Sequence, residues 1–397
     1  MKKINILFLD IEGGHGGSSL SLFKTIQYLD RTQVKPIVIC KKKGIFNAYK
    51  DLGINCTVEN RMPTFSSLRK DNRNLLFFFY FIFFLWPTSY FFRKRLNRLI
   101  ASESIDLIHC NLISLFVLAK WLKKKNPSIP ITLHVRTNPV LNFTSKIQAK
   151  LSSSVFDDYI YITENEKKNM ISLLGKKLPG KIIFNSAEIT NSNIYIENTK
   201  TKLPLEILTL SNYSYPRGID RVIDIASHIP DHLRNKFRFT IAGDYKFPRF
   251  MPYHLKILGF KGSTLKDYAK LKGVEDLFVF KGHVRNVAGI IDNSDVLIKP
   301  TRENNPWGRD IIEALSKGKA VISVGAYDKF VKTNYTGLLQ KKYNAYEIVD
   351  WLLKHANNLK LFEKYKKNAI KIVHEICNPS KNAKKSLIFW KNIVKNK

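Results

Sequence analysis

Residues 300–337 read PTRENNPWGRDIIEALSKGKAVISVGAYDKFVKTNYTG, a loop followed by a helical segment, a short apolar run and a second loop. Asn305 is a favourable N-cap and the proline after it suits a first helical turn, so the pattern predicts a helix over residues 307–316. Gly318 fits the position that closes this helix, and residues 319–324 have the composition of a buried strand. A loop that enters a helix presents free backbone N–H groups and the positive end of the helix dipole, and both favour an anion.

The same alternation runs through both halves of the chain. Short apolar runs, bounded by glycine, proline or polar residues, alternate with segments of helical periodicity. Because parallel strands need long crossover connections, this order predicts parallel sheets of the α/β class. The expected strands are 4–10, 35–40, 55–58, 105–110, 130–134, 159–163 and 181–184 in the first half, and 207–211, 237–243, 277–280, 295–298 and 319–324 in the second.

Several short motifs in the second half resemble the donor-binding signature of the retaining family-4 glycosyltransferases (glycosyl transferases group 1). The matching segments are Pro300-Thr301, residues 306–310 (Pro-Trp-Gly-Arg-Asp), Glu313-Ala314, residues 318–322 (Gly-Lys-Ala-Val-Ile) and residues 336–338 (Thr-Gly-Leu). The first glutamate of the family pattern is missing, because position 305 holds Asn305 and Glu303 lies two residues out of register.

The resemblance implies the GT-B fold, in which two Rossmann-like domains with parallel sheets face each other across a cleft. Residues 1–186 would form the acceptor-binding domain, and the polar, weakly patterned residues 187–202 would be a linker. Residues 203–380 would bind a nucleotide-sugar, and a helix over 381–397 would return to the first domain. The implied reaction moves a sugar from a nucleotide-diphosphate donor to a lipid-linked or saccharide acceptor, of the bacterial surface polysaccharide type, with retention of configuration.

The resemblance also assigns roles in the donor site. Arg217 would grip the departing diphosphate and Glu313 would hold the ribose. Asn212 stands where the family has an arginine, so half of the phosphate clamp is lost, and Arg302 or Lys299 are candidate replacements. The implied catalytic residues are His134, Arg217 and Glu313, and the implied donor-binding residues are Gly16, Gly17, Asn212, Gly218, Gly243, His283, Val284, Glu303, Asn305 and Arg309.

Four of these residues, Gly16, Gly17, His134 and Glu313, have a plainer explanation as well. The glycine-rich loop over residues 12–19 (EGGHGGSS) suits a phosphate that approaches backbone N–H groups, but it also suits a tight turn. His134 ends an expected strand, where ligands of parallel sheets bind, but a structural histidine is the alternative. Glu313 lies one helical turn after Arg309, so an ion pair on the helix surface is its alternative.

An uncharged aromatic segment interrupts the first half. Residues 75–92 read LLFFFYFIFFLWPTSYFF, and eleven of the eighteen are aromatic. The length is close to that of a membrane-spanning helix, but Pro87 is expected to break it and basic residues flank both ends. Aromatic rings at headgroup level and basic flanks on anionic lipid favour a segment that lies on a membrane surface. A buried helix and a true span are the alternatives.

Charge and cysteine usage narrow the function classes. The 66 basic and 32 acidic side chains give a net charge of +34, which favours an anionic partner such as a membrane surface or a phosphorylated substrate. The basic residues are dispersed and no nucleic-acid-binding module is recognisable, so no specific nucleic-acid partner is expected. The four cysteines are scattered, which indicates free thiols in a reducing compartment. The expected location is cytoplasmic, peripheral on the inner face of the plasma membrane.

The sequence leaves three other functions open. A catalytically inactive GT-B homologue, acting as a binding partner or scaffold, fits the departures at Asn305 and Asn212. A nucleotide-sugar epimerase would need carboxylates in the cleft, and a nucleic-acid-binding protein would explain the charge. The motif Asp-x-Asp is not seen near an expected strand end, so no essential metal and no cofactor besides the donor substrate are expected.

Overall fold

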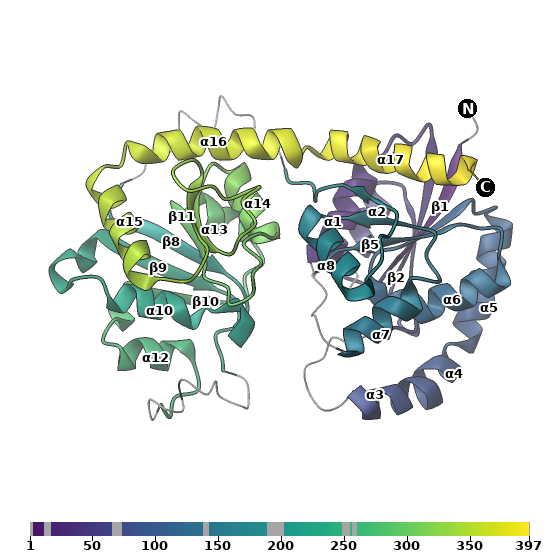
Figure 1. Cartoon of the computed structure of the whole chain (residues 1–397), viewed down its shortest axis with the longest axis horizontal. Coiled ribbons are helices and arrows are strands. Elements are labelled where there is room, and N and C mark those ends of the chain that lie inside the picture. The colour runs from purple at the N-terminus through teal and green to yellow at the C-terminus, as the bar shows by residue number, and fades with distance from the viewer. Residues whose placement is uncertain are drawn as a thin grey trace. The chain divides into compact units, whose positions relative to one another are not determined.

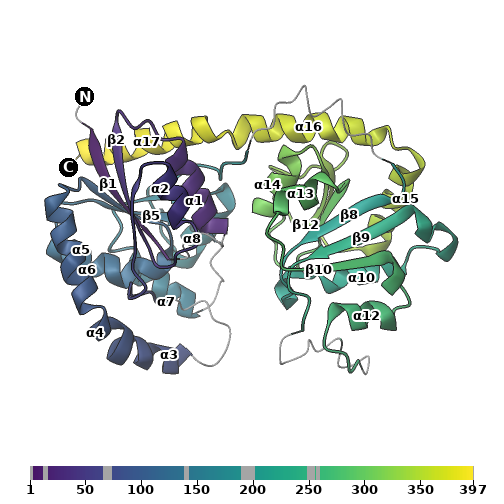
Figure 2. The same ribbon diagram turned by 180° about the vertical axis from the view of Figure 1, so that it is seen from behind.

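The computed structural model describes residues 3–11, 17–65, 74–137, 143–188, 202–247, 255 and 260–396. The chain divides into two compact units, one made of Met1–Ser186 and Pro379–Lys397 and the other of Ala187–Asn378. Each unit is built on a parallel sheet of its own (Figures 1 and 2). Gly16 and residues 189–201 of the expected linker lie outside the described residues.

The sheet of the first unit has seven strands in the order β3-β2-β1-β4-β5-β6-β7, and all its pairs are parallel. The strands are β1 (Ile4–Asp10), β2 (Val34–Cys40), β3 (Asn55–Val58), β4 (Leu107–Cys110), β5 (Ile131–Val135), β6 (Asp158–Tyr161) and β7 (Lys181–Ile182). The helices are α1 (Gly17–Gln27), α2 (Phe46–Asp51), α3 (Asn74–Tyr80), α4 (Trp86–Thr88), α5 (Tyr90–Ser102), α6 (Phe116–Lys125), α7 (Phe143–Ser152), α8 (Glu164–Leu174) and α17 (Pro379–Lys395), with a π-helical turn η1 (Phe81–Leu85) and a 3-10 turn η2 (Ile113–Leu115).

Both faces of this sheet are covered, which is why its strands are continuously apolar. Alternate residues of β1 enter two separate cores: Ile6 and Phe8 pack with α1, α2 and α17, whereas Leu7 and Leu9 pack with α5, α6 and α8. Trp390 of α17 packs edge-on against Phe8, with ring centroids 5.2 Å apart.

The sheet of the second unit has six parallel strands in the order β10-β9-β8-β11-β12-β13. They are β8 (Leu205–Leu210), β9 (Phe237–Ala242), β10 (Phe278–Gly282), β11 (Val296–Lys299), β12 (Ala320–Val324) and β13 (Gly337–Gln340). The helices are α10 (Asp220–Ser227), α12 (Leu265–Leu271), α13 (Val287–Asp292), α14 (Arg309–Ser316), α15 (Ala345–Asn357) and α16 (Leu361–Ile376), with 3-10 turns η3 (Tyr215–Arg217), η4 (Asp231–Lys236) and η5 (Glu275–Leu277). The prediction of two parallel α/β sheets is confirmed.

The aromatic segment is helical apart from a turn at Ser89 and runs along the outside of its unit as α3, η1, α4 and α5 (Figures 1 and 2). The expected break at Pro87 is wrong, because the helix continues through this residue and bends at Ser89. A proline lacks an N–H group, and the π-helical turn before it accommodates the missing bond. Among the described residues no single helix could span a membrane, although Leu76–Thr88 and Tyr90–Ser102, bent by 57°, together have the necessary length and composition.

One buried carboxyl gives the first unit a pH-dependent stability. Glu166, in the first turn of α8, is 1 % exposed, and burial raises the pKa of its carboxyl from 4.5 to about 7, although a hydrogen bond from Thr163 acts in the opposite direction. The folded protein therefore holds this proton more tightly than the unfolded chain does. The resulting stability is fully present below pH 4.5 and is lost as the pH rises to about 7.

We expect Glu166→Gln to abolish this pH dependence. Since one pKa unit corresponds to about 1.4 kcal/mol, the wild type should lose about 3 kcal/mol between these two pH values, and the variant should not. Urea unfolding of both proteins at pH 5 and pH 8 measures the difference. Parallel pH profiles of the two proteins would show that Glu166 is ionised in the folded state.

Candidate functional site

The candidate donor site of the second unit is built where its strands end. The segments after β8, β9 and β10 are joined by backbone hydrogen bonds, since Gly243 N–H donates to the Gly282 carbonyl at 2.7 Å and Tyr213 N–H donates to the Asp244 carbonyl. Asn212, the residue in place of the family arginine, accepts from the Asp244 N–H at 2.8 Å. Asn212 therefore links the segments that follow β8 and β9, and its side chain is uncharged.

Two glycines of the predicted site allow loops to approach closely. Gly218 has φ +68°, and a Cβ on it would lie 2.2 Å from the Pro300 carbonyl oxygen. Gly243 has φ +141°, and its Cβ would lie 2.2 Å from the Ser211 carbonyl oxygen. A larger residue at position 218 would push the end of η3 away from the loop after β11, and one at position 243 would push the end of β9 away from the segment after β8.

We expect Gly218→Ala to lower the free energy of unfolding by about 2–4 kcal/mol, because strained backbone and a steric clash add. Gly273→Ala is the matched control, since Gly273 has φ +65° and open space around its Cβ position. It should cost only about 1 kcal/mol. Urea unfolding measures both, and equal losses would contradict the close approach of Pro300.

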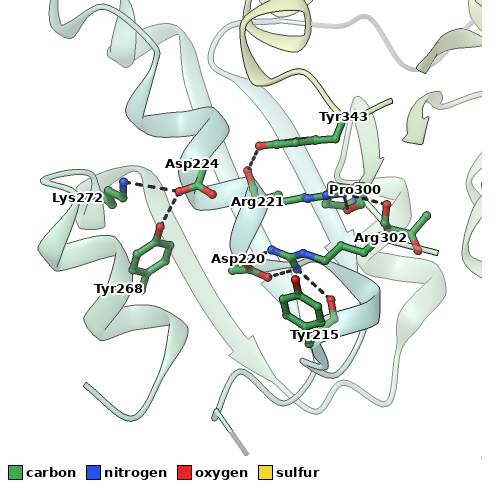
Figure 3. A network of polar contacts seen from close by, with 10 residues as sticks. Tyr215, Asp220, Arg221, Asp224, Tyr268, Lys272, Pro300, Arg302 and Tyr343 are labelled. Carbon is green, nitrogen blue, oxygen red and sulfur yellow. Dashed lines mark hydrogen bonds and ion pairs between the residues drawn. The ribbon is translucent and has the colours of Figure 1, made fainter. Parts of the chain in front are cut away.

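Two basic side chains at this edge are already neutralised. Arg302 forms a two-pronged ion pair with the fully buried Asp220, with Nη1–Oδ1 at 2.8 Å and Nη2–Oδ2 at 2.5 Å, and its guanidinium lies 4.2 Å from the Tyr215 ring centroid (Figure 3). Lys299 donates to the Trp307 carbonyl at 2.9 Å and to Asp310 at 3.0 Å. Arg302 and Lys299, the candidate replacements for the missing half of the clamp, are therefore each paired with a carboxylate of the same unit.

A third arginine, Arg221, serves the loop after β11. It donates to the carbonyls of Pro300 at 3.1 Å and Thr301 at 3.0 Å, and it lies 4.2 Å from the ring centroid of Tyr343 (Figure 3). The Tyr343 hydroxyl in turn donates to the Arg221 carbonyl. This network fixes the loop that follows β11 against the start of α10.

Arg217 differs from these neighbours. It is exposed at the end of η3, and its Nη1 donates to the Ser211 hydroxyl at 2.7 Å and to the Asn212 carbonyl at 3.3 Å. Within the described part of the chain no carboxylate pairs with it. One edge of the guanidinium is thus oriented by neutral groups, and its charge remains for an anion.

Glu313 and Arg309 form the ion pair that their spacing allows. Arg309 Nε donates to Glu313 Oε1 at 2.9 Å, and Nη2 contacts the same oxygen. Both side chains are mostly buried, at 14 % and 25 % exposure for Arg309 and Glu313. The ion pair fixes the orientation of the Glu313 carboxylate. Its second oxygen is therefore suited to accept a hydrogen bond from a ligand hydroxyl.

The entry to α14 differs from the prediction. The helix begins at Arg309 after Gly308, and no side chain caps it, so the prediction of Asn305 as N-cap is wrong. Trp307 is buried and stacks on Phe330 at 5.9 Å, which holds the preceding residues in a loop. Asn305 is partly buried within this loop, and its Oδ1 has no hydrogen-bond partner among the described residues.

Three of the remaining donor-site candidates follow the strand ends of the second unit, and one lies in the first unit. His283 and Glu303 are exposed, Val284 is half-buried, and Gly17 is the exposed first residue of α1 in the other unit. A cavity of about 800 Å³ lies elsewhere, along the edge strand β10 and lined by Tyr245, and none of the predicted donor residues borders it. We therefore place the candidate site at the strand ends and not in this cavity.

His134 is enclosed in the first unit. Burial, and then the positive charge of Arg136, lower the pKa of its imidazole well below 6.5, so the ring is neutral at pH 7. Its buried Nε2 has no hydrogen-bond partner in the described part of the unit. It borders a cavity of about 20 Å³ between β5 and α7, which has room for about one water molecule.

A buried polar chain crosses the strand ends of the first unit, and sequence reasoning missed most of it. Asn111 donates to Asp10 Oδ1 at 2.9 Å, and Arg136 donates to Asn111 at 2.5 Å and to Asn185 at 2.8 Å. These residues follow or end β1, β4, β5 and β7, and Asp10 and Asn111 are fully buried. The signal in the sequence was a polar residue at or shortly after the end of four apolar strands.

One family model matches most of the second unit. Residues 193–372 match the family model described as glycosyl transferases group 1. No curated protein matched the chain.

Solved structures share the fold of the whole chain. HepE of Anabaena in complex with UDP has a TM-score of 0.71 at 17 % identity, covering 98 % of this chain and 100 % of its own. A glycosyltransferase from Rickettsia africae has 0.70 at 16 % and sucrose-phosphate synthase from Thermosynechococcus elongatus has 0.73 at 14 %, each covering 100 % of both chains. The predicted GT-B fold class is confirmed, and the family match together with this fold supports a glycosyltransferase.

Proposed function

We propose that the chain is a retaining family-4 glycosyltransferase that moves a hexose or related sugar from a nucleotide-diphosphate donor to a lipid-linked or saccharide acceptor of bacterial surface polysaccharide. The observation that carries the proposal is how the basic side chains at the strand ends of the second unit are paired with carboxylates. Of Arg217, Lys299, Arg302 and Arg309, all described, only Arg217 lacks a carboxylate partner. HepE structures hold UDP and UDP-glucose, so a uridine diphosphate donor is the first to test.

In this proposal Arg217 neutralises the charge that develops on the leaving diphosphate, which is electrostatic catalysis. Glu313, oriented by Arg309, accepts hydrogen bonds from the ribose hydroxyls. His134 stays neutral, so it contributes a hydrogen bond to the sugar and not a charge.

We also propose that transfer needs no divalent ion. The sequence has no Asp-x-Asp motif near an expected strand end, which is the pattern that would hold one. Activity that persists in excess EDTA is expected, and full loss that Mg²⁺ or Mn²⁺ restores would refute this point.

The aromatic segment suggests where the enzyme works. It is no buried core helix, because Leu76 is 72 % exposed, Phe83 65 %, Phe84 60 % and Phe91 63 %. Only one stripe, which includes Phe81, Phe92 and Leu96, packs into the unit. We propose that the exposed rings enter the headgroup layer of the inner face of the plasma membrane, where a lipid-linked acceptor is found.

A second function is favoured by one observation. Asn212 and Asn305 are uncharged, and Arg302 is paired with Asp220. Of the described residues considered for the diphosphate clamp, Arg217 is thus the one cation without a carboxylate partner. A GT-B protein with a weakened donor site would serve as a binding partner or scaffold.

A thermal-shift panel of nucleoside diphosphates and nucleotide sugars on the full chain distinguishes the two functions. A ligand at about 100 times its Kd should stabilise the protein by about 2.7 kcal/mol. Glu313→Ala should weaken this stabilisation, and Arg238→Ala, at the opposite end of the sheet, should not. No shift with any nucleotide would favour the scaffold.

A further inference from the structure

Three successive lysines stand at the strand ends of the first unit. Lys41, Lys42 and Lys43, here called the lysine loop, directly follow β2. The loop is anchored between neighbouring strands, because Lys41 N–H donates to the Asp10 carbonyl at 2.9 Å and Glu59 N–H donates to the Cys40 carbonyl at 2.8 Å. The carboxyl ends of parallel strands are where ligands of such sheets bind.

The lysine loop has no anion of its own in the described part of the unit. The half-buried Lys41 donates to a neutral group, the Thr64 hydroxyl, at 2.9 Å, while Lys42 and Lys43 are exposed. Burial, and then the charge of Lys42, lower the pKa of Lys41. The neighbouring carboxylate Glu59 is engaged by Arg95. Three adjacent cations without a carboxylate are suited to a group that carries more than one negative charge.

The loop is physically joined to the aromatic segment. Thr64, which Lys41 contacts, precedes Phe65, and the Phe65 ring packs against Phe77, Phe78 and Phe81 with centroids 5.8, 6.2 and 5.2 Å away. Thr64 and Phe65 thus connect the lysine loop to the aromatic segment, whose ring Phe78 is 44 % exposed.

We propose that the lysine loop binds the phosphate of a membrane-anchored acceptor, whose lipid chain lies beside the aromatic segment. The proposal rests on the proposed function and narrows its acceptor to lipids linked through phosphate or diphosphate. It commits to the acceptor and not to bulk phospholipid, because the loop lies at the ligand-binding edge of the sheet.

Flotation of the full chain with vesicles tests the proposal. Phosphatidylcholine vesicles carry a minor fraction of polyprenyl phosphate in one arm and phosphatidylglycerol of equal total charge in the other. The variant is Lys42→Gln/Lys43→Gln, which leaves the half-buried Lys41 in place. The control is Lys124→Gln/Lys125→Gln, an equal loss of charge on two exposed lysines at the end of α6.

Binding of the lysine-loop variant to polyprenyl phosphate should weaken about tenfold, while its binding to phosphatidylglycerol and both bindings of the control change little. Equal weakening in both arms, or in variant and control, would show general charge attraction and overturn the proposal, as would unchanged binding. The nucleotide thermal shift of the same variant should equal that of the wild type. If the wild type shows no shift, the proposed function fails, and the flotation result still decides the lysine loop by itself.

Discussion

Arg217→Ala is expected to remove nearly all stabilisation of the protein by a nucleoside diphosphate. The wild-type guanidinium is oriented by Ser211 and Asn212 and has no described carboxylate partner, so it meets a diphosphate without breaking an ion pair. Charged hydrogen bonds to phosphate contribute roughly 1.5–3 kcal/mol each, which predicts about 100-fold weaker binding. Titration of the nucleotide by thermal shift or calorimetry measures the change.

Removing a positive charge elsewhere in the second unit should not weaken nucleotide binding. Arg238→Ala removes the same charge at the start of β9, where Arg238 pairs with Glu206 at 3.0 Å, and should bind nucleotide as the wild type does. Arg217→Lys keeps the charge but not the planar fork and should be intermediate. Wild-type affinity in Arg217→Ala would exclude this residue from the donor site.

Phe83→Ser/Phe84→Ser is expected to release the protein from anionic vesicles. Each ring is more than half exposed, so neither is needed for the core. Burying a phenylalanine in an apolar phase yields about 1.5–3 kcal/mol, and loss of two should weaken vesicle binding by 100-fold or more. Co-sedimentation with vesicles gives the partition coefficient.

A matched loss of apolar surface elsewhere serves as the control. Leu271→Ser/Ile388→Ser changes two side chains that are 55 % and 50 % exposed on α12 and α17. This variant should bind vesicles as the wild type does. Equal release of both double variants, or none, would contradict surface docking, and wild-type protein that resists alkaline extraction would indicate a bent span instead.

Strand positions could be predicted because both faces of each sheet are covered. The bounds of β1 match the expected residues 4–10, since its apolar run ends where the sheet meets a polar loop. The bounds of the edge strand β3 also match the expected residues 55–58. The ion pair between Arg309 and Glu313 was also visible, because residues four apart on a helix are neighbours.

Contacts between distant residues could not be predicted. Arg302 and Asp220 lie 82 positions apart, and their pairing follows from the order of strands in the sheet. The start of α14 depends on Trp307 packing over Phe330, which outweighs the capping preference of Asn305. The chain Asp10–Asn111–Arg136 likewise needs the strand order β1-β4-β5 before its members can be seen as neighbours.

The last helix has a consequence for the order of events during synthesis. α17 belongs to the first unit, where Trp390 fills the core beside Phe8 and Asn382 donates to the Phe184 carbonyl. The ribosome makes Met1–Ser186 first, then all of Ala187–Asn378, and only then this helix. The apolar surface that α17 covers therefore stays exposed on the nascent first unit until the second unit has been translated. Chaperones that bind exposed apolar surface would act on the chain during this interval.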